Sequence, residues 1–325
     1  MSCRTSPYYK KPHGMTPDMA ELKEDFPLHW NIACKKMEAI KLKLAVWCTD
    51  REKGIELANK PFEPTIFNSI INENWWKLGP LISLTPLEFC IFESNLDVRC
   101  LKILIKSGLI DINRPSTKLE GMPPLHFSLQ LDQNEDVALA IIQSGKAILN
   151  THFKGYQPSH LAAKKGFFNV LNELHLRGIN LNMRVTEGVD TGLSPLQIAV
   201  ANNQIDCAIE LLKRNMIQLE TDTSTDDRTF SIIQYALANK NIELMSAILS
   251  NNPSIDSVLL DIGEGGEVNF EMTTLIDFAF ANDDATMLPL LAEYGQELDE
   301  TQLEYVINDP DTYVNISSYL NSRID

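Results

Sequence analysis

The fold of this chain is decided by the stretch Thr85-Pro86-Leu87-Glu88-Phe89-Cys90, which returns five more times in altered form. The clearer copies are Pro123-Pro124-Leu125-His126-Phe127-Ser128, Gln157-Pro158-Ser159-His160-Leu161-Ala162 and Ser194-Pro195-Leu196-Gln197-Ile198-Ala199, and the degenerate ones are Ser231-Ile232-Ile233-Gln234-Tyr235-Ala236 and Thr274-Leu275-Ile276-Asp277-Phe278-Ala279. The second position recurs in steps of 38, 34, 37, 37 and 43 residues. A period of this size indicates stacked structural repeats.

A second pattern repeats in phase with the first. Apolar residues spaced three and four apart predict helices over residues 98–107, 136–144, 168–177, 205–214, 242–250 and 284–294. Each helix is followed by a glycine or an asparagine: Gly108, Gly145, Gly178, Asn215, Asn251 and Gly295. These two residue types adopt the left-handed conformation that ends a helix at the lowest cost. Each repeat therefore predicts a pair of helices.

The openings resemble the Thr-Pro-Leu-His-x-Ala signature of ankyrin repeats, and the helix–glycine–apolar–asparagine endings are similar to theirs. The resemblance covers about residues 81–310. It implies an all-α fold, an ankyrin-repeat solenoid of about six helix pairs with long finger loops, preceded by a small helical N-terminal region. It also implies that His126 and His160 hydrogen-bond to backbone groups across the repeat turn, in place of a catalytic or metal-binding role.

The signature residues have structural reasons. Threonine or serine caps the first helix, and proline at its first position costs nothing because that N–H has no partner in any helix. Leucine and alanine pack between helices, since a lone helix pair cannot bury its apolar face without a neighbour.

Four segments are predicted along the chain. Residues 1–17 are expected to be a flexible lead, residues 18–80 a helical region that packs on the array, residues 81–298 the ankyrin repeats, and residues 299–325 a C-terminal cap. Within the second segment, Trp75 and Trp76 either pack on the first repeat or are exposed anchors for a partner.

Charge is distributed unevenly. The net charge is −16, and residues 216–325 hold 21 acidic and 3 basic residues. Phosphate contacts need lysine and arginine, so this composition argues against nucleic acid as a ligand. A protein partner that is basic or of mixed charge fits this composition better.

Membrane and disulfide signals are also missing from the sequence. No run approaches the roughly 18 apolar residues of a membrane span, and the six cysteines are too scattered for a disulfide framework. We therefore expect a cytoplasmic protein with reduced thiols, and we expect it to be a monomer.

Motifs for chemistry are missing from the sequence. The phosphate-binding, dinucleotide-binding, serine-hydrolase and zinc-protease patterns do not occur. His152 and His160 lie eight residues apart, which fits no tight metal spacing. We therefore expect no catalytic residue, no cofactor and no metal.

Long loops are the remaining candidates for function. They cover residues 114–122, 183–193, 221–230 and 263–273, and loops carry function because they vary without disturbing the packed helices. The resemblance implies that partners dock on these fingers and on the groove formed by the first helices. The candidate partner-binding residues are Arg114, Lys118, His152, Phe153, Lys154, Tyr156, Arg184, Asp222, Asp226 and Asp227, together with Trp75 and Trp76.

Three functions are compatible with these features. The first is a non-catalytic scaffold that binds a partner protein. The divergent repeats with long insertions resemble those of ankyrin effectors, which intracellular bacteria secrete into the host cell cytosol. The second is an enzyme or adaptor whose N-terminal helical region acts on a substrate selected by the repeats. The third is an inhibitory subunit whose acidic C-terminal repeats mask a basic surface.

Overall fold

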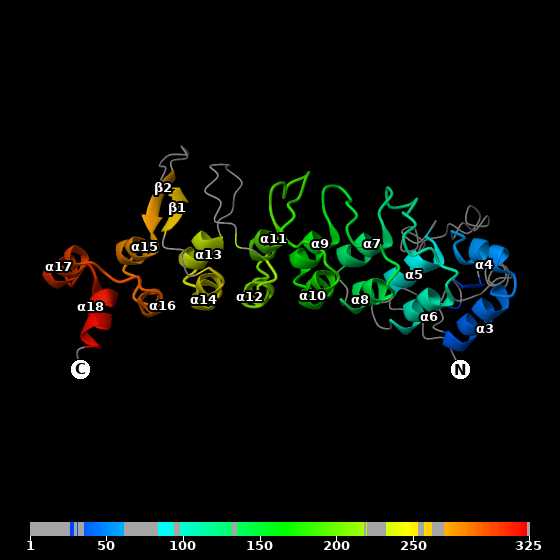
Figure 1. Ribbon diagram of the computed structural model, residues 1–325, viewed down its shortest axis with the longest axis horizontal. Helices are drawn as coiled ribbons and strands as arrows, with labels where there is room; N and C mark the ends of the chain where they lie inside the picture. The colour runs from blue at the N-terminus through cyan, green and yellow to red at the C-terminus, as the bar shows by residue number, and fades with distance from the viewer. Residues whose placement is uncertain are drawn as a thin grey trace, which may run out of the picture. The chain divides into compact units, whose positions relative to one another are not determined.

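The computed structural model describes residues 27–28, 31, 36–61, 84–93, 98–131, 135–217, 219, 232–252, 257–261 and 270–323. Over this part of the chain the fold consists of helix pairs with a single hairpin of two strands, as Figure 1 shows. The prediction of an all-α fold of repeated helix pairs is confirmed. The chain divides into two compact units: unit 1 takes the residues up to Ala162 together with Asn169–Ile179, and unit 2 takes Ala163–Phe168 together with Asn180–Asp325.

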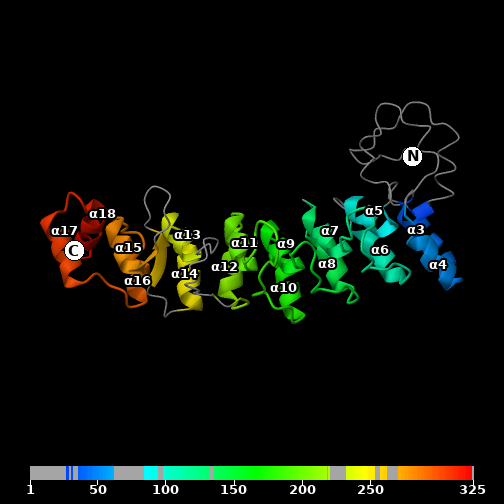
Figure 2. The same cartoon turned by 90° about the horizontal axis from the view of Figure 1, so that it is seen from above.

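Unit 1 stacks helices of like position in consecutive repeats. Its helices are α3 (Met37–Trp47), α4 (Arg51–Ala58), α5 (Pro86–Glu93), α6 (Arg99–Ser107), α7 (Pro124–Gln130) and α8 (Asp136–Gln143). Helix α5 packs on α7, and α6 packs on α8, so first helices meet first helices and second helices meet second helices (Figure 2). The next pair, α9 (Pro158–Lys165) and α10 (Phe168–Leu176), contains the boundary between the units.

Unit 2 repeats this arrangement. Its helices are α11 (Pro195–Ala201), α12 (Ile205–Lys213), α13 (Ile232–Ala238), α14 (Ile242–Asn251), α15 (Leu275–Ala281), α16 (Leu288–Glu293), α17 (Glu300–Asn308) and α18 (Val314–Asn321). Helix α11 packs on α13 and α12 on α14, and each first helix also contacts its own second helix. The two terminal helices, α17 and α18, pack on each other.

Two details differ from the sequence-based expectations. Strands β1 (Ser257–Asp261) and β2 (Phe270–Thr274) pair antiparallel, with Ser257 opposite Thr274, so the prediction of a loop over residues 263–273 is wrong for residues 270–273. Helix α16 begins at Leu288 and not at Asp284, because the Asp284 carboxylate accepts hydrogen bonds from the main chain and the hydroxyl of Thr286 and so holds a turn.

The helix ends follow the predicted chemistry at five of the six expected positions. Gly108, Gly145, Gly178, Gly295 and Asn215 have positive φ angles between 51° and 79°. Asn251 is the exception, because it still belongs to α14, and its side-chain amide donates to Leu212 O at 3.3 Å and to Asn215 Oδ1 at 2.9 Å.

The signature positions are joined by a recurring hydrogen bond. The main-chain N–H of the first residue donates to the side chain of the fourth: Thr85 to Glu88 Oε2 at 2.7 Å, Gln157 to His160 Nδ1 at 2.9 Å, and Ser194 to Gln197 Oε1 at 2.8 Å. In the second repeat the first residue is Pro123, which has no N–H. As a result, Nδ1 of the fully buried His126 has no hydrogen-bond partner among the described residues.

The core is formed by aliphatic side chains of the paired helices. Leu101, Leu104 and Ile141 in unit 1 and Leu211 and Ile248 in unit 2 are fully buried. Cys90, Cys100 and Cys207 are also buried, and they are free thiols.

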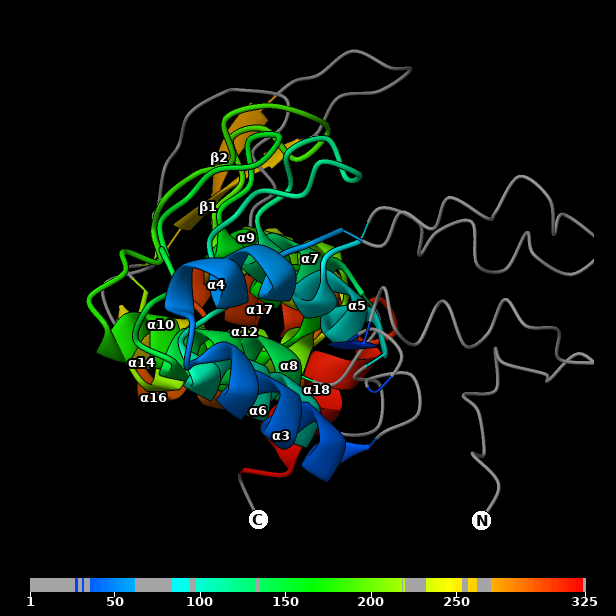
Figure 3. The same ribbon diagram turned by 90° about the vertical axis from the view of Figure 1, so that its right-hand side faces the viewer.

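The N-terminal helix hairpin, α3 and α4, packs on the first repeat. Helix α3 contacts α6 (Figure 3), and the break between α3 and α4 is fixed by Asp50, whose carboxylate caps α4 at Lys53 N. Buried Asn59, just after α4, donates to Leu109 O at 2.8 Å and accepts from Asp111 N at 2.9 Å. One side chain therefore fastens the hairpin to the turn that follows α6.

Candidate functional site

The first two described fingers lie in unit 1; one connects α6 to α7 and the other connects α8 to α9. We call residues 114–122 the first finger and residues 146–157 the second finger. In the second finger, Phe153 and Tyr156 exchange main-chain hydrogen bonds of 3.0 and 3.1 Å, which close the tip around Lys154 and Gly155. In the first finger, Ser116 N donates to Met122 O at 2.9 Å, and Gly121 N donates to Ser116 O at 2.8 Å. Both tips are therefore closed loops.

His126, on α7, is hydrogen-bonded to the second finger. Its Nε2 donates to the carbonyl oxygen of Tyr156 at 3.0 Å, so the expectation that this histidine bonds to backbone across the repeat turn is confirmed. For His160 the structure shows a bond to backbone within its own repeat, since its Nδ1 accepts from Gln157 N three residues earlier. Burial lowers the pKa of His126 to about 4, although the hydrogen bond to Tyr156 raises it in part. At neutral pH the ring is uncharged.

Phe153 and Lys154 are the prominent side chains of the second finger. The Phe153 ring lies edge-on to His126, with centroids 6.1 Å apart, and is half-buried. Lys154 is exposed, lies 5.5 Å from the Phe153 centroid and forms an ion pair of 2.5 Å with Glu120 in the first finger. That contact lowers the pKa of Glu120. The structure thus brings together His152, Phe153, Lys154 and Tyr156, and Gln157 Nε2 donates to His152 Nε2 at 3.1 Å.

The predicted basic residues differ in what they contact. The Arg114 guanidinium donates to Asn59 O at 3.2 Å, so it fastens the N-terminal hairpin. The Arg184 guanidinium donates to Gly192 O at 2.7 Å within its own loop. Lys118 is exposed in the first finger.

The third finger, residues 183–193, belongs to unit 2. Val185 N donates to Leu193 O at 3.0 Å and Gly192 N donates to Val185 O at 2.9 Å, so the base of the loop is closed like a short ladder. Lys164 forms an ion pair of 2.9 Å with Asp190 near the tip. These contacts present Val189, whose side chain is 88% exposed.

Val189 and Glu120 were not predicted as site residues. A lone valine in a polar loop and a glutamate between glycine and leucine carry no sequence signal, and only the folded loops show that one is exposed and that the other pairs with Lys154. The remaining predicted residues, Trp75, Trp76, Asp222, Asp226 and Asp227, lie outside the described residues.

Within the described ranges, no group of three or more histidine, cysteine, aspartate or glutamate side chains could hold a metal ion. Among the same residues, no helix is long and apolar enough to cross a bilayer.

Comparison with known proteins identifies ankyrin repeats in part of the chain. Residues 159–258 match the family model of ankyrin repeats in three copies. The chain is 28% identical over 149 residues to the fowlpox virus (strain NVSL) protein named as ankyrin repeat protein FPV031, which covers 45% of this chain and 42% of the viral protein. The chain thus matches less than half the length of that relative. The crystal structure of the ankyrin repeat domain of Bcl-3 is similar with a TM-score of 0.49 and 16% identity, over 70% of this chain and 86% of that one.

Ankyrin repeats imply a role in protein–protein interaction, because stacked repeats create extended binding surfaces. The helix pairs, the signature hydrogen bonds and the closed fingers described above agree with the match. The chain therefore carries ankyrin repeats, which the family model identifies across residues 159–258.

Proposed function

We propose that this chain is a non-catalytic binding protein that uses its fingers to contact a partner protein. The observation that carries the proposal is that the described finger tips are closed by their own hydrogen bonds while their outer side chains stay exposed. Ordering a loop on binding costs conformational entropy, and a loop that is already ordered avoids that cost. Such loops favour recognition over a purely structural role.

The second finger in unit 1 offers the most varied contacts. Phe153 provides an aromatic surface and Lys154 a positive charge, and Lys118 adds an exposed positive charge in the first finger. Exposed charges at the rim of an interface mainly steer association and select partners. A partner of mixed charge, with a carboxylate near Lys118 of the first finger, fits these two fingers.

The third finger in unit 2 offers a different contact. Val189 is the most exposed of the large apolar side chains in the described residues, and an apolar tip on a braced loop suits insertion into a shallow pocket of a partner. The ion pair between Lys164 and Asp190 keeps that tip in place.

Other parts of the sequence-based hypothesis stay predictions. They are the absence of catalysis, the use of Trp75, Trp76, Asp222, Asp226 and Asp227, delivery into a host cell by a bacterium, location in the cytoplasm and the monomeric state. An inhibitory role towards a basic surface is compatible with the acidic last third of the chain.

The test is a quantitative affinity capture with single-residue variants. Lys118→Glu and Val189→Ser each change one exposed finger side chain, and both are expected to lose partners that the wild-type chain retains. The matched controls are Lys102→Glu, exposed on α6, and Leu176→Ser, 70% exposed on α10, which make the same chemical changes on helices. Equal loss in the finger variants and in the controls, or no loss in either, would show that the fingers are not the binding surface.

A further inference from the structure

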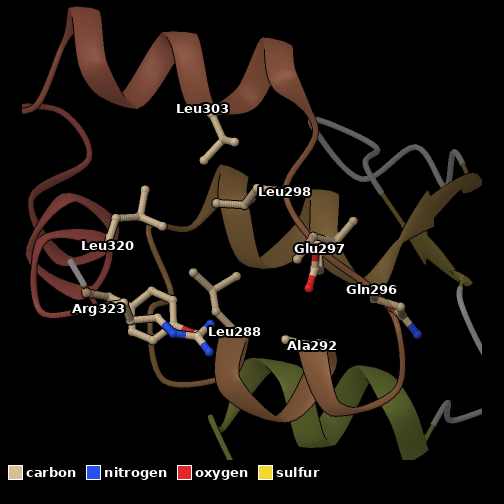
Figure 4. A pocket seen from close by; sticks show the side chains of 10 residues that line it. Leu288, Ala292, Gln296, Glu297, Leu298, Leu303, Leu320 and Arg323 are labelled. Carbon is tan, nitrogen blue, oxygen red and sulfur yellow. The ribbon is translucent and has the colours of Figure 1, made fainter.

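A cavity of about 200 Å³ lies in unit 2 among the last four helices, α15 to α18 (Figure 4). Leu288 from α16, Leu303 from α17 and Leu320 from α18 turn toward one another there, and Leu298 joins them from the turn before α17. Leu288 is buried, but the other three leucines are half-buried. A helix pair that only closed a stack would be expected to cover such side chains or replace them with polar ones.

The size of this cavity fits one large side chain. An engineered cavity of about 150 Å³ lined by aliphatic and aromatic residues binds benzene. The present cavity is somewhat larger and opens to solvent, so it can receive a phenylalanine ring or a leucine side chain from outside. Ile276 and Ala292 complete its apolar wall.

The charge around the cavity is strongly one-sided. Residues 270–323 hold eleven acidic residues and one basic residue, Arg323. Several of the carboxylates have partners within the chain; for example, Asp299 caps α17, and Asp283 accepts from the main chain at the start of α18. Glu297 lines the cavity and is exposed, and within the described part of the chain it forms no hydrogen bond or ion pair. Glu293 and Glu304, next in sequence to lining residues, are also exposed.

Arg323, the one basic residue of this range, follows α18 and contacts Tyr319 on that helix. The Arg323 guanidinium donates to the Tyr319 hydroxyl at 3.0 Å and lies 5.6 Å from the centroid of the same ring. Both residues line the cavity, and Glu297 lies away from Arg323 (Figure 4). The negative charge at the rim is therefore available to a ligand.

We infer that this cavity receives one large apolar side chain of a basic partner segment, whose lysine or arginine side chains contact Glu297 and the neighbouring glutamates. The inference rests on the proposed function, because it names a second contact surface and the chemistry of the protein partner that fits it. Charge complementarity selects the occupant: the apolar wall accepts a leucine or a phenylalanine, and the acidic rim favours a positively charged neighbour over an acidic one.

A random-peptide library displayed on phage tests this without knowledge of the partner. Multivalent display compensates for the weak binding that one anchored side chain gives. Panning on the full chain is expected to enrich peptides in which leucine or phenylalanine lies beside lysine or arginine. Enriched peptides are then synthesised with a fluorescent label, and their binding to the full chain is measured by anisotropy.

The decisive variant is Glu297→Lys, since the side chain is exposed and the change leaves the apolar wall intact. It is expected to weaken binding of the enriched peptides by about tenfold or more, and Leu320→Gln is expected to do the same through the wall. The controls are Glu56→Lys, exposed on α4, and Leu176→Gln, exposed on α10, which should leave binding unchanged. Circular dichroism of each variant confirms that the helices are retained.

Other outcomes overturn the inference. They are enrichment of acidic peptides, failure to enrich any sequence, or binding that is indifferent to Glu297→Lys. Self-association of the chain that Glu297→Lys abolishes would make a second copy the occupant, and would overturn the basic partner as well. If Lys118→Glu and Val189→Ser reduce partner capture while Glu297→Lys changes nothing, the proposed function stands and this inference alone fails.

Discussion

Nε2 of His126 donates a 3.0 Å hydrogen bond to the carbonyl oxygen of Tyr156, thirty residues later in the chain. The donor comes from the first helix of one repeat, and the acceptor from the finger that leads into the next. The other ring nitrogen of His126, Nδ1, is buried and has no hydrogen-bond partner in the described part of the chain. One uncharged imidazole thus links a helix of the stack to a finger tip.

Protonation of His126 is expected to destabilise the fold. Its pKa is lowered from 6.5 to about 4 in the folded chain, mainly by burial. Between these values the unfolded chain binds a proton that the folded chain does not, so stability is fully present above the unfolded pKa and falls as the pH drops toward the folded pKa. The loss over this window is about 3 kcal/mol at most.

His126→Gln removes this titration. Its free energy of unfolding in urea should depend less on pH than that of the wild type between about pH 7 and about pH 4.5. The control His175→Gln replaces an exposed histidine on α10 and should keep the wild-type dependence. Parallel curves for the wild type and His126→Gln would contradict the assignment.

A substitution at Pro123 should stabilise the second repeat. Pro123→Ser restores the main-chain N–H that the corresponding residues donate in three other repeats, and Nδ1 of His126 is placed to accept it. Pairing a buried acceptor and adding a helix cap each contribute about 1 kcal/mol, and losing the proline restraint costs somewhat less than 1 kcal/mol. The expected net gain is about 1 kcal/mol, read from thermal unfolding. Pro115→Ser, in the exposed first finger, is the control; a lower melting temperature for Pro123→Ser would contradict the argument.

Much of the fold followed from local sequence chemistry. Helix periodicity and the following glycines placed the second helices to within a few residues, because both are properties of neighbouring residues. The hairpin of β1 and β2 was missed, since its two strands pair across an insertion and each is only five residues long. The hydrogen bonds of Asn59 could not be predicted either, because its partners, Leu109 and Asp111, are about fifty residues away in the sequence.

The candidate site was less accessible to sequence reasoning than the fold. Fingers were recognised as loops, but whether a lysine or an arginine has a partner within the chain depends on acceptors that only the folded chain brings near. Arg114 and Lys118 look alike in sequence and are both exposed, yet the Arg114 guanidinium donates to Asn59 O and so fastens the N-terminal hairpin. Exposure of Val189 likewise depends on the ladder at the base of its loop.

The side-chain amide of Asn59 should contribute more to the free energy of unfolding than that of Asn113, which occupies the equivalent position in the next repeat. Asn113 makes the same pair of hydrogen bonds, to Lys146 O at 2.9 Å and from Ile148 N at 2.8 Å, but in a more exposed position. Removing a buried partner leaves main-chain groups unpaired, which costs about 1–3 kcal/mol per group, whereas exposed groups find water. Asn59→Ala should therefore destabilise the chain more than Asn113→Ala. Hydrogen exchange of residues 37–58 should speed up in Asn59→Ala alone, and equal exchange in both variants would refute the difference.

A substitution at Gly54 tests how closely α4 packs against the end of α3 in the N-terminal hairpin. In the interior of a helix, glycine to alanine normally stabilises by about 1 kcal/mol. Here a Cβ built on Gly54 would lie 2.3 Å from the Trp47 carbonyl oxygen and 3.0 Å from its carbon, and main-chain atoms cannot move aside as a side chain can. The crowding should outweigh the helix propensity, so Gly54→Ala is expected to lower stability by about 1–3 kcal/mol. Lys53→Ala, at an exposed neighbouring position of α4, serves as the control and should leave the melting temperature nearly unchanged. A melting temperature of Gly54→Ala at or above that of the wild type would mean that α3 and α4 are not packed as closely as the structure shows.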